Sequence, residues 1–228
     1  MMSTLNVPGA QLYYEVSGDG PLLILIPGAK GEGEVFRPVA RELAARYQVV
    51  TYDRRGFSRS KLDGTQDYAH RLDTDADDVR CLIEYLTDKP ATVFGNSSGA
   101  IVALEIISHY PERVHTVVAH EPPAVNLLPD AAKWRAFFDG VYDTYRQSGV
   151  PKAMHQFASG TVGSVDHQVM EHAMREHTNE YTLSNTRYWM EHELRQYPRV
   201  ELDLDTLAAH AERIVLAGGR DSQDQLPY

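Results

Sequence analysis

The sequence has 228 residues, 43% of them hydrophobic and 24% charged, and its formal net charge is −10. This length and apolar content suit one globular unit with a sizeable core, and the acidic balance argues against a nucleic-acid or anionic-membrane partner. Residues 1–6 show no leader pattern, no apolar run approaches membrane-spanning length and Cys81 is the only cysteine, so we expect a soluble, cytoplasmic protein without an internal disulfide.

Strands and helices are predicted to alternate along most of the chain. Short runs rich in β-branched, aliphatic or aromatic residues predict strands at 11–17, 22–26, 49–52, 92–94, 114–119 and 213–217. Apolar residues at helical spacing predict helices within 36–47, 72–86 and 100–107. This alternation is typical of a mostly parallel, doubly wound sheet with helices on both faces.

The segment 91–101 is predicted to be a strand that turns sharply into a buried helix. The pattern Gly-x-Ser-x-Gly stands at the corner and is formed by Gly95, Ser97 and Gly99. Such a corner strains the serine backbone so that the hydroxyl stands clear of the sheet, and the glycines let strand and helix approach closely. The helix N-terminus directs free N–H groups at the place where an oxyanion would form. We therefore predict that Ser97 is a catalytic serine.

Other candidate residues also follow the ends of predicted strands. Ala29, Asp53 and Glu121 each come within three residues of such an end, as Ser97 does. Sites in parallel sheets lie at the carboxyl ends of the strands. We therefore expect these four residues to converge in one cleft.

At this point the sequence resembles the α/β-hydrolases. The matching segments span residues 22–221 and are Ile26-Pro27-Gly28, Asp53-x-Arg55-Gly56-x-Ser58, Gly95-Asn96-Ser97-Ser98-Gly99, Tyr110-Pro111-Glu112-Arg113-Val114 and Gly218-Gly219-Arg220-Asp221. A narrower resemblance, to the lactone-cleaving hydrolases of the zearalenone hydrolase type, rests on the serine segment and on His120-Glu121-Pro122-Pro123. The resemblance implies the α/β-hydrolase fold with a helical cap over the active site.

Residues 124–207 interrupt the alternation and are rich in aromatic side chains such as Trp134, Phe138 and Trp189. The resemblance implies three parts: a hydrolase core at 1–123, a helical cap at 124–207 and a continuation of the core at 208–228. Singly, each aromatic residue is expected to fix the cap to the core. Together they suggest a mostly apolar substrate pocket.

The resemblance also implies catalytic roles. Ser97 would attack an acyl carbon, and the backbone N–H groups of Ser98 and Ala29 would hold the oxyanion. Two carboxylates are candidates for the acid that orients the catalytic base. Asp221 follows the last predicted strand, which is the usual position in the family, and Glu121 matches the lactone-hydrolase arrangement. The sequence does not separate them.

The general base is not found at its usual place. The family order is serine, then acid, then histidine, but no histidine follows Asp221. We expect that the chain lacks the last strand and helix of the fold and is inactive alone for want of this histidine. If the chain is active as it stands, His120 is the most plausible base.

Two classes of function remain open. The first is a serine hydrolase that cleaves a carboxylic ester or lactone of a mostly apolar small molecule, with a cofactor-free haloperoxidase as a close relative. The second is a catalytically silent module that binds a small molecule on the same scaffold. No cofactor and no metal are expected, because His192-Glu193 does not continue into a zinc motif.

Overall fold

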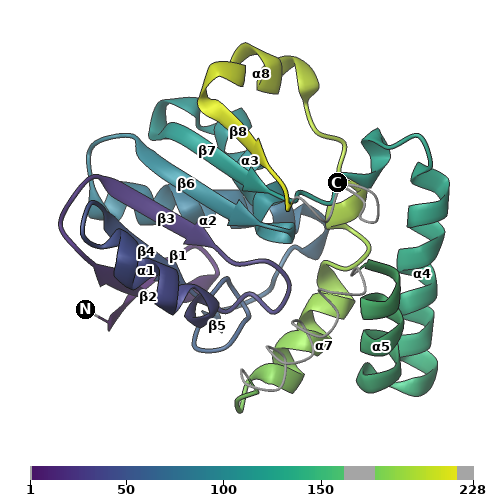
Figure 1. Ribbon diagram of the computed structural model, residues 1–228. Coiled ribbons are helices and arrows are strands. Elements are labelled where there is room, and N and C mark those ends of the chain that lie inside the picture. Colours follow the sequence, from purple (N-terminus) through teal and green to yellow (C-terminus); the bar gives the residue numbers. More distant parts are fainter. Residues whose placement is uncertain (1, 162–177, 220–228) are drawn as a thin grey trace.

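The computed structural model describes residues 2–161 and 178–219, and one sheet runs through them (Figure 1). Its eight strands lie in the order β1-β2-β4-β3-β6-β7-β8, with β5 paired to β2. The strands are β1 (Met2–Val7), β2 (Ala10–Ser17), β3 (Leu22–Ile26), β4 (Gln48–Tyr52), β5 (Lys61–Leu62), β6 (Ala91–Asn96), β7 (Val114–His120) and β8 (Ile214–Ala217).

The central part of the sheet is parallel, as predicted. Neighbouring strands from β4 through β3, β6 and β7 to β8 all pair in parallel. β1, β2 and β5 add antiparallel pairs at one side. The sequence pattern did not indicate β1, which is an edge strand with alternately exposed and half-buried residues.

Helices cover both faces of this sheet. The α-helices are α1 (Arg37–Leu43), α2 (Arg71–Leu86), α3 (Ser98–His109), α4 (Ala131–Ser148), α5 (Val150–Thr161), α7 (Thr182–His192) and α8 (Leu204–Ala209). α2 and α3 pack on one face within the largest apolar cluster, and α1 contributes Ala40 to a smaller cluster on the other. None of the helices in the described ranges is both long and apolar enough to cross a membrane.

Sequence patterns explain why these elements lie where they do. All five residues of β3 are buried, because the strand lies between β4 and β6 and is covered on both faces. The predicted apolar face of α2 is buried at Leu72, Ala76, Val79 and Ile83. α3 is buried through most of its length, as its nearly continuous apolar run predicts.

The helices α4, α5 and α7 come between β7 and β8 in the sequence and pack on one another beyond the ends of the parallel strands (Figure 1). We call these three the cap helices. They share a second apolar cluster that is separate from the main core. The division of the chain at residues 123 and 207 stays a prediction.

Candidate active site

The turn from β6 into α3 has the geometry that the serine motif predicts. Ser97 has φ 53° and ψ −122°, a conformation that L-residues rarely adopt. A Cβ at Gly95 would overlap the carbonyl oxygen of Gly99, and a Cβ at Gly99 would overlap that of Ile26. Both glycines are therefore required by close backbone approach, which confirms the expected strand–turn–helix corner.

Backbone strain marks the same edge of the sheet at four places. The non-glycine residues with positive φ in the described chain are Lys30, Ser58, Ser97 and Glu121. They follow β3, β4, β6 and β7, four parallel strands that lie side by side. Strain of this kind gathers at functional sites, and the carboxyl ends of parallel strands are where such sites lie. The structure thus points to this edge as the candidate site.

The loop after β3 lies against the serine. A Cβ at Gly28 would lie 2.8 Å from the carbonyl oxygen of Asn96 and 3.0 Å from Ser97 Cβ. Ala29, the next residue, therefore stands beside the serine turn, as the predicted oxyanion site requires. Among the described residues, neither the N–H of Ala29 nor that of Ser98 donates a hydrogen bond. Both N–H groups are therefore available to donate to a ligand oxygen.

Glu121 is held close to this turn by the strand ends. The Ser97 N–H donates to the carbonyl oxygen of His120 at 2.9 Å, and the Glu121 N–H donates to that of Ala217 at 2.9 Å. The Glu121 carboxylate accepts the Gly219 N–H at Oε1, at 2.8 Å. Glu121 directly follows His120, whose carbonyl oxygen accepts the Ser97 N–H, so Glu121 is fixed close to the serine turn. Asp221, the other candidate acid, lies outside the described residues.

The His120 side chain is hydrogen-bonded to Asn96 and not to Ser97. Its Nδ1 lies 2.8 Å from the side-chain oxygen of Asn96, the residue opposite it in the β6–β7 pairing. An amide oxygen only accepts, so Nδ1 is assigned the hydrogen. Within the described chain no hydrogen bond joins the Ser97 hydroxyl to an imidazole.

Asp53 follows a strand, as predicted, but its carboxylate is occupied by structure. It accepts hydrogen bonds from the Gly33 N–H at 2.9 Å and the Arg59 N–H at 3.1 Å. It also forms an ion pair with the Arg59 side chain at 2.6 Å. Asp53 therefore fixes the loops after β3 and β4 and is not free for chemistry.

The aromatic residues of the cap helices mostly pack on one another. Phe157 meets Trp189 edge to face with ring centroids 5.1 Å apart, and Trp134 meets Phe137 at 5.8 Å. Ala29 is packed against the same apolar cluster. The predicted oxyanion loop thus borders an apolar region. Residues 162–177 of the predicted cap, which include Met170 and Met174, lie outside the described residues.

A buried charge cluster beneath the site was not foreseen from the sequence. We call it the ion cluster and define it as Arg54, Arg71, Asp75, Glu193 and Tyr197. Arg54 donates to both Glu193 oxygens at 3.0 Å, and Arg71 donates to Glu193 Oε1 at 2.9 and 3.1 Å. Arg54 and the Tyr197 hydroxyl both donate to Asp75. The four charged side chains are at most 2% exposed.

The charges of the ion cluster support one another electrostatically. Burial would raise the pKa of Asp75, but the Arg54 and Arg71 guanidiniums outweigh burial and hold that pKa below its ordinary value. Burial would also lower the pKa of both arginines, yet Asp75 and Glu193 raise it. Asp75 and the two arginines therefore stay charged at neutral pH. Glu193 directly follows α7, so the cluster joins the cap side to α2 and the loop after β4.

A second polar contact joins the loop after β3 to the segment before α7. Asn179 donates to Glu32 Oε1 at 2.7 Å. Burial raises the pKa of Glu32, although the Asn179 bond opposes this, and burial lowers the pKa of Lys30. The loop that carries Ala29 is therefore in contact with the cap side through both apolar and polar groups.

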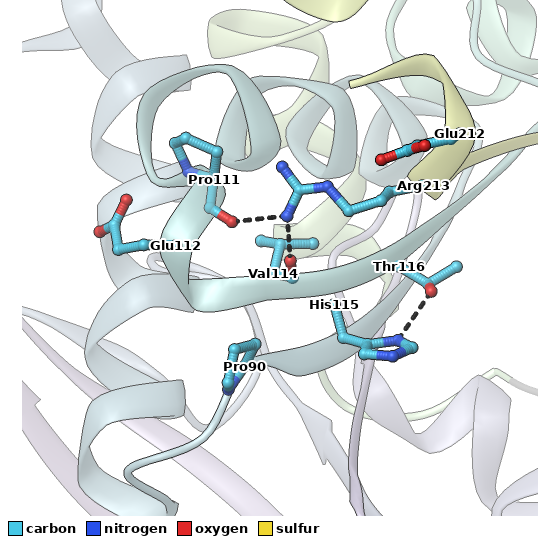
Figure 2. A pocket seen from close by; sticks show the side chains of 8 residues that line it. All are labelled: Pro90, Pro111, Glu112, Val114, His115, Thr116, Glu212 and Arg213. Atoms are coloured by element: carbon cyan, nitrogen blue, oxygen red, sulfur yellow. Dashed lines mark hydrogen bonds between the residues drawn. The ribbon is translucent and has the colours of Figure 1, made fainter. Parts of the chain in front are cut away.

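A broad surface hollow of about 540 Å³ lies at the opposite end of the strands (Figure 2). Its lining residues are Pro90, Pro111, Glu112, Val114, His115, Thr116, Glu212 and Arg213. They include the start of β7 and residues just before β6 and β8, far along the strands from Ser97. Figure 2 shows Arg213 donating to the carbonyl oxygens of Pro111 and Val114. Both distances are 2.8 Å. The hollow is thus separate from the strained edge.

One group of possible metal donors was also missed by the sequence reasoning. Side-chain donor atoms of Asp73, Glu105 and His109 lie within 4.8 Å of one another on α2 and α3. Asp73 and His109 are exposed, and His109 is already 3.2 Å from Glu105 as an ion pair. The expectation that the protein needs no metal stays a prediction.

Comparison with known proteins places this geometry in a family. Residues 21–197 match the family described as alpha/beta hydrolase fold. An uncharacterized hydrolase from Bacillus subtilis, YraK, is 35% identical over 231 residues, which cover 99% of this chain and 80% of that protein. Zearalenone hydrolase from Bionectria ochroleuca is 35% identical over 127 residues, covering 53% of this chain and 47% of the relative.

Solved structures agree on the fold. A thermophilic esterase from Thermogutta terrifontis superimposes with a TM-score of 0.73 at 19% identity, over 96% of this chain and 79% of the esterase chain. At this identity the likeness concerns the fold alone. Together with the family match over residues 21–197, it leads to one conclusion. The chain belongs to the alpha/beta hydrolase fold family.

Proposed function

We propose that this protein is a serine hydrolase that cleaves a carboxylic ester or lactone of a mostly apolar small molecule through an acyl-enzyme. The observation that carries the proposal is the strained Ser97 at the corner of β6 and α3, packed against the loop of Gly28 and Ala29. A strained serine turn of this kind costs conformational energy, which is understandable where the hydroxyl must be presented to a substrate.

In the proposed reaction, the Ser97 oxygen attacks the acyl carbon while a histidine accepts its proton. The acyl oxygen becomes an oxyanion, and the N–H groups of Ala29 and Ser98 donate to it. The leaving alcohol takes this proton from the histidine, and the acyl-enzyme remains. Water then attacks the acyl-enzyme with the same histidine as base, and the acid is released as Ser97 regains its proton. Each oxyanion donor contributes about 3 kcal/mol to such a step in well-studied hydrolases.

We take Glu121 as the acid that orients the base. In support, Glu121 has φ 53° directly after β7, and its Oε1 is bound by a backbone N–H. Its Oε2 makes no hydrogen bond within the described residues, so this oxygen is available for an imidazole N–H. The partial match to zearalenone hydrolase, over 53% of this chain, also supports the lactone-hydrolase arrangement. Asp221 is the competing choice.

The substrate class follows from the surroundings of Ala29. Its side chain packs against the apolar cluster that includes Phe57, Trp134 and Trp189. A ligand bound beside Ala29 would meet the apolar side chains of this cluster. An ester or lactone with an apolar body fits such surroundings better than a highly charged substrate does. The relative named zearalenone hydrolase supports a lactone as one form of that substrate.

Replacing Ser97 tests the proposal. In the full-length protein, Ser97→Ala should lower turnover of p-nitrophenyl esters by more than about a hundredfold, because loss of a nucleophile removes the acyl-enzyme route. Ser108→Ala on the same helix is the matched control and should keep activity. If Ser97→Ala turns over these esters as fast as the wild type does, Ser97 is not the nucleophile. Failure of the wild-type protein to turn over any ester or lactone would favour the silent binding module.

A further inference from the structure

The hydroxyl of Ser98 is buried without a partner. Ser98 is the first residue of α3, and it is 5% exposed. In the described structure its Oγ makes no hydrogen bond to any protein group. Most buried side-chain polar atoms have a partner, and one without a partner loses its hydration with nothing in return. An orphan hydroxyl directly after the nucleophile therefore needs an explanation.

Its position on the helix explains why the usual partner is missing. Other helical hydroxyls of this protein donate to the carbonyl oxygen four residues earlier, as Ser108 does to Leu104 at 3.0 Å and Thr186 does to Thr182 at 2.7 Å. For Ser98 the corresponding residue is Phe94, which belongs to β6 and lies between β3 and β7 in the sheet. The helix therefore offers this hydroxyl no backbone acceptor.

The orphan lies at the junction of the two oxyanion segments. The turn that contains Ser98 is in close backbone contact with the loop after β3, because a Cβ at Gly99 would lie 2.7 Å from the carbonyl oxygen of Pro27. On the other side of Ser98, Ser97 Cβ faces Gly28. A ligand oxygen held by the N–H groups of Ala29 and Ser98 would sit within this contact. It would also be an acceptor of the kind that the Ser98 hydroxyl lacks.

We propose that the Ser98 hydroxyl is a third donor to the oxyanion, in addition to the two backbone N–H groups. This inference rests on the proposed serine hydrolase function. The hydroxyl keeps its proton throughout, so no bond is broken at Ser98. The hydrogen bond strengthens as the acyl oxygen gains negative charge. An interaction of this kind acts in the transition state and affects kcat more than KM.

The experiment compares Ser98→Ala with Ser108→Ala in the full-length protein. For Ser98→Ala we expect kcat on p-nitrophenyl esters to fall by roughly a hundredfold, the lower end of the effect of a lost oxyanion donor, with KM nearly unchanged. Inhibition by phenylboronic acid, whose serine adduct is also tetrahedral, should weaken in parallel. The urea midpoint of Ser98→Ala should stay or rise, because an unpaired buried hydroxyl is removed. Ser108→Ala should lower the midpoint and leave kcat unchanged.

The outcomes separate this inference from the proposed function. Wild-type kcat in Ser98→Ala, while Ser97→Ala is inactive, would overturn the third donor and leave the nucleophile in place. A urea midpoint that falls as much in Ser98→Ala as in Ser108→Ala would show that the protein already satisfies the hydroxyl, and would also overturn it. Full activity of Ser97→Ala would overturn both.

Discussion

The serine turn and the ion cluster lie at the same edge of the sheet but are built in different ways. Ser97 is positioned by backbone geometry, with Gly95 and Gly99 on its two sides. The ion cluster is held almost entirely by side chains, with Arg54 and Glu193 separated by 139 residues in the sequence. One region is therefore set by a few consecutive residues, whereas the other exists only once the whole chain has folded.

This difference predicts different consequences of mutation. Side chains at the turn contribute little to packing, so their loss should lower turnover and leave stability nearly unchanged. Side chains of the ion cluster are buried and paired, so their loss should lower stability.

Glu121 should show the behaviour of the catalytic region. In the full-length protein, Glu121→Gln should lower ester turnover by about 10⁴-fold, because an amide in place of the acid holds the imidazole in the wrong tautomer. The amide oxygen can still accept the Gly219 N–H, so the unfolding free energy should change little. Asp221→Asn, measured beside it, should keep most of the activity.

The reverse pattern would assign the acid to Asp221. A large loss from Asp221→Asn with a small one from Glu121→Gln would make Glu121 a structural residue at the end of β7. Small and equal losses would mean that neither carboxylate orients the base. Steady-state kinetics and urea unfolding of both variants distinguish these cases.

Glu193 should show the behaviour of the ion cluster. Glu193→Ala leaves Asp75 as the one carboxylate that pairs with Arg54 and Arg71 among the described residues. Breaking a buried ion pair on one side costs about 3–5 kcal/mol of unfolding free energy. Glu191→Ala is the matched control, because Glu191 is exposed and, among the described residues, its carboxylate accepts a hydrogen bond from the Tyr145 hydroxyl alone, at 2.6 Å. It should cost no more than about 1 kcal/mol. Equal urea midpoints for the two variants would contradict the division of roles.

The same contrast explains what the sequence could predict. The strained Ser97 and the close approach of Gly95 and Gly99 are local, so a five-residue pattern was sufficient to predict them. The parallel sheet was predictable because its strands are rich in β-branched and aliphatic residues, most clearly in the continuous apolar run of β3. β1 was not, because an edge strand with one half-exposed face carries no such run.

The ion cluster could not be predicted, because no local pattern links Arg54 and Arg71 to Glu193. For Asp53, the sequence suggested a role that the folded structure does not support. Its place after β4 suggested a role in the site, but Arg59, six residues later, occupies its carboxylate. Position at a strand end is thus not sufficient to make a residue part of the site, since the partners of its side chain depend on the folded loops.

Covalent labelling tests the central claim, that Ser97 is an activated nucleophile, most directly. The full-length protein is treated with a fluorophosphonate, digested and analysed by mass spectrometry, with Ser97→Ala treated in parallel. The account predicts rapid, stoichiometric labelling of the peptide that contains Ser97 and no labelling of that peptide in the variant. A wild-type protein that stays unlabelled, or a label that forms equally fast on another residue in both proteins, would contradict it.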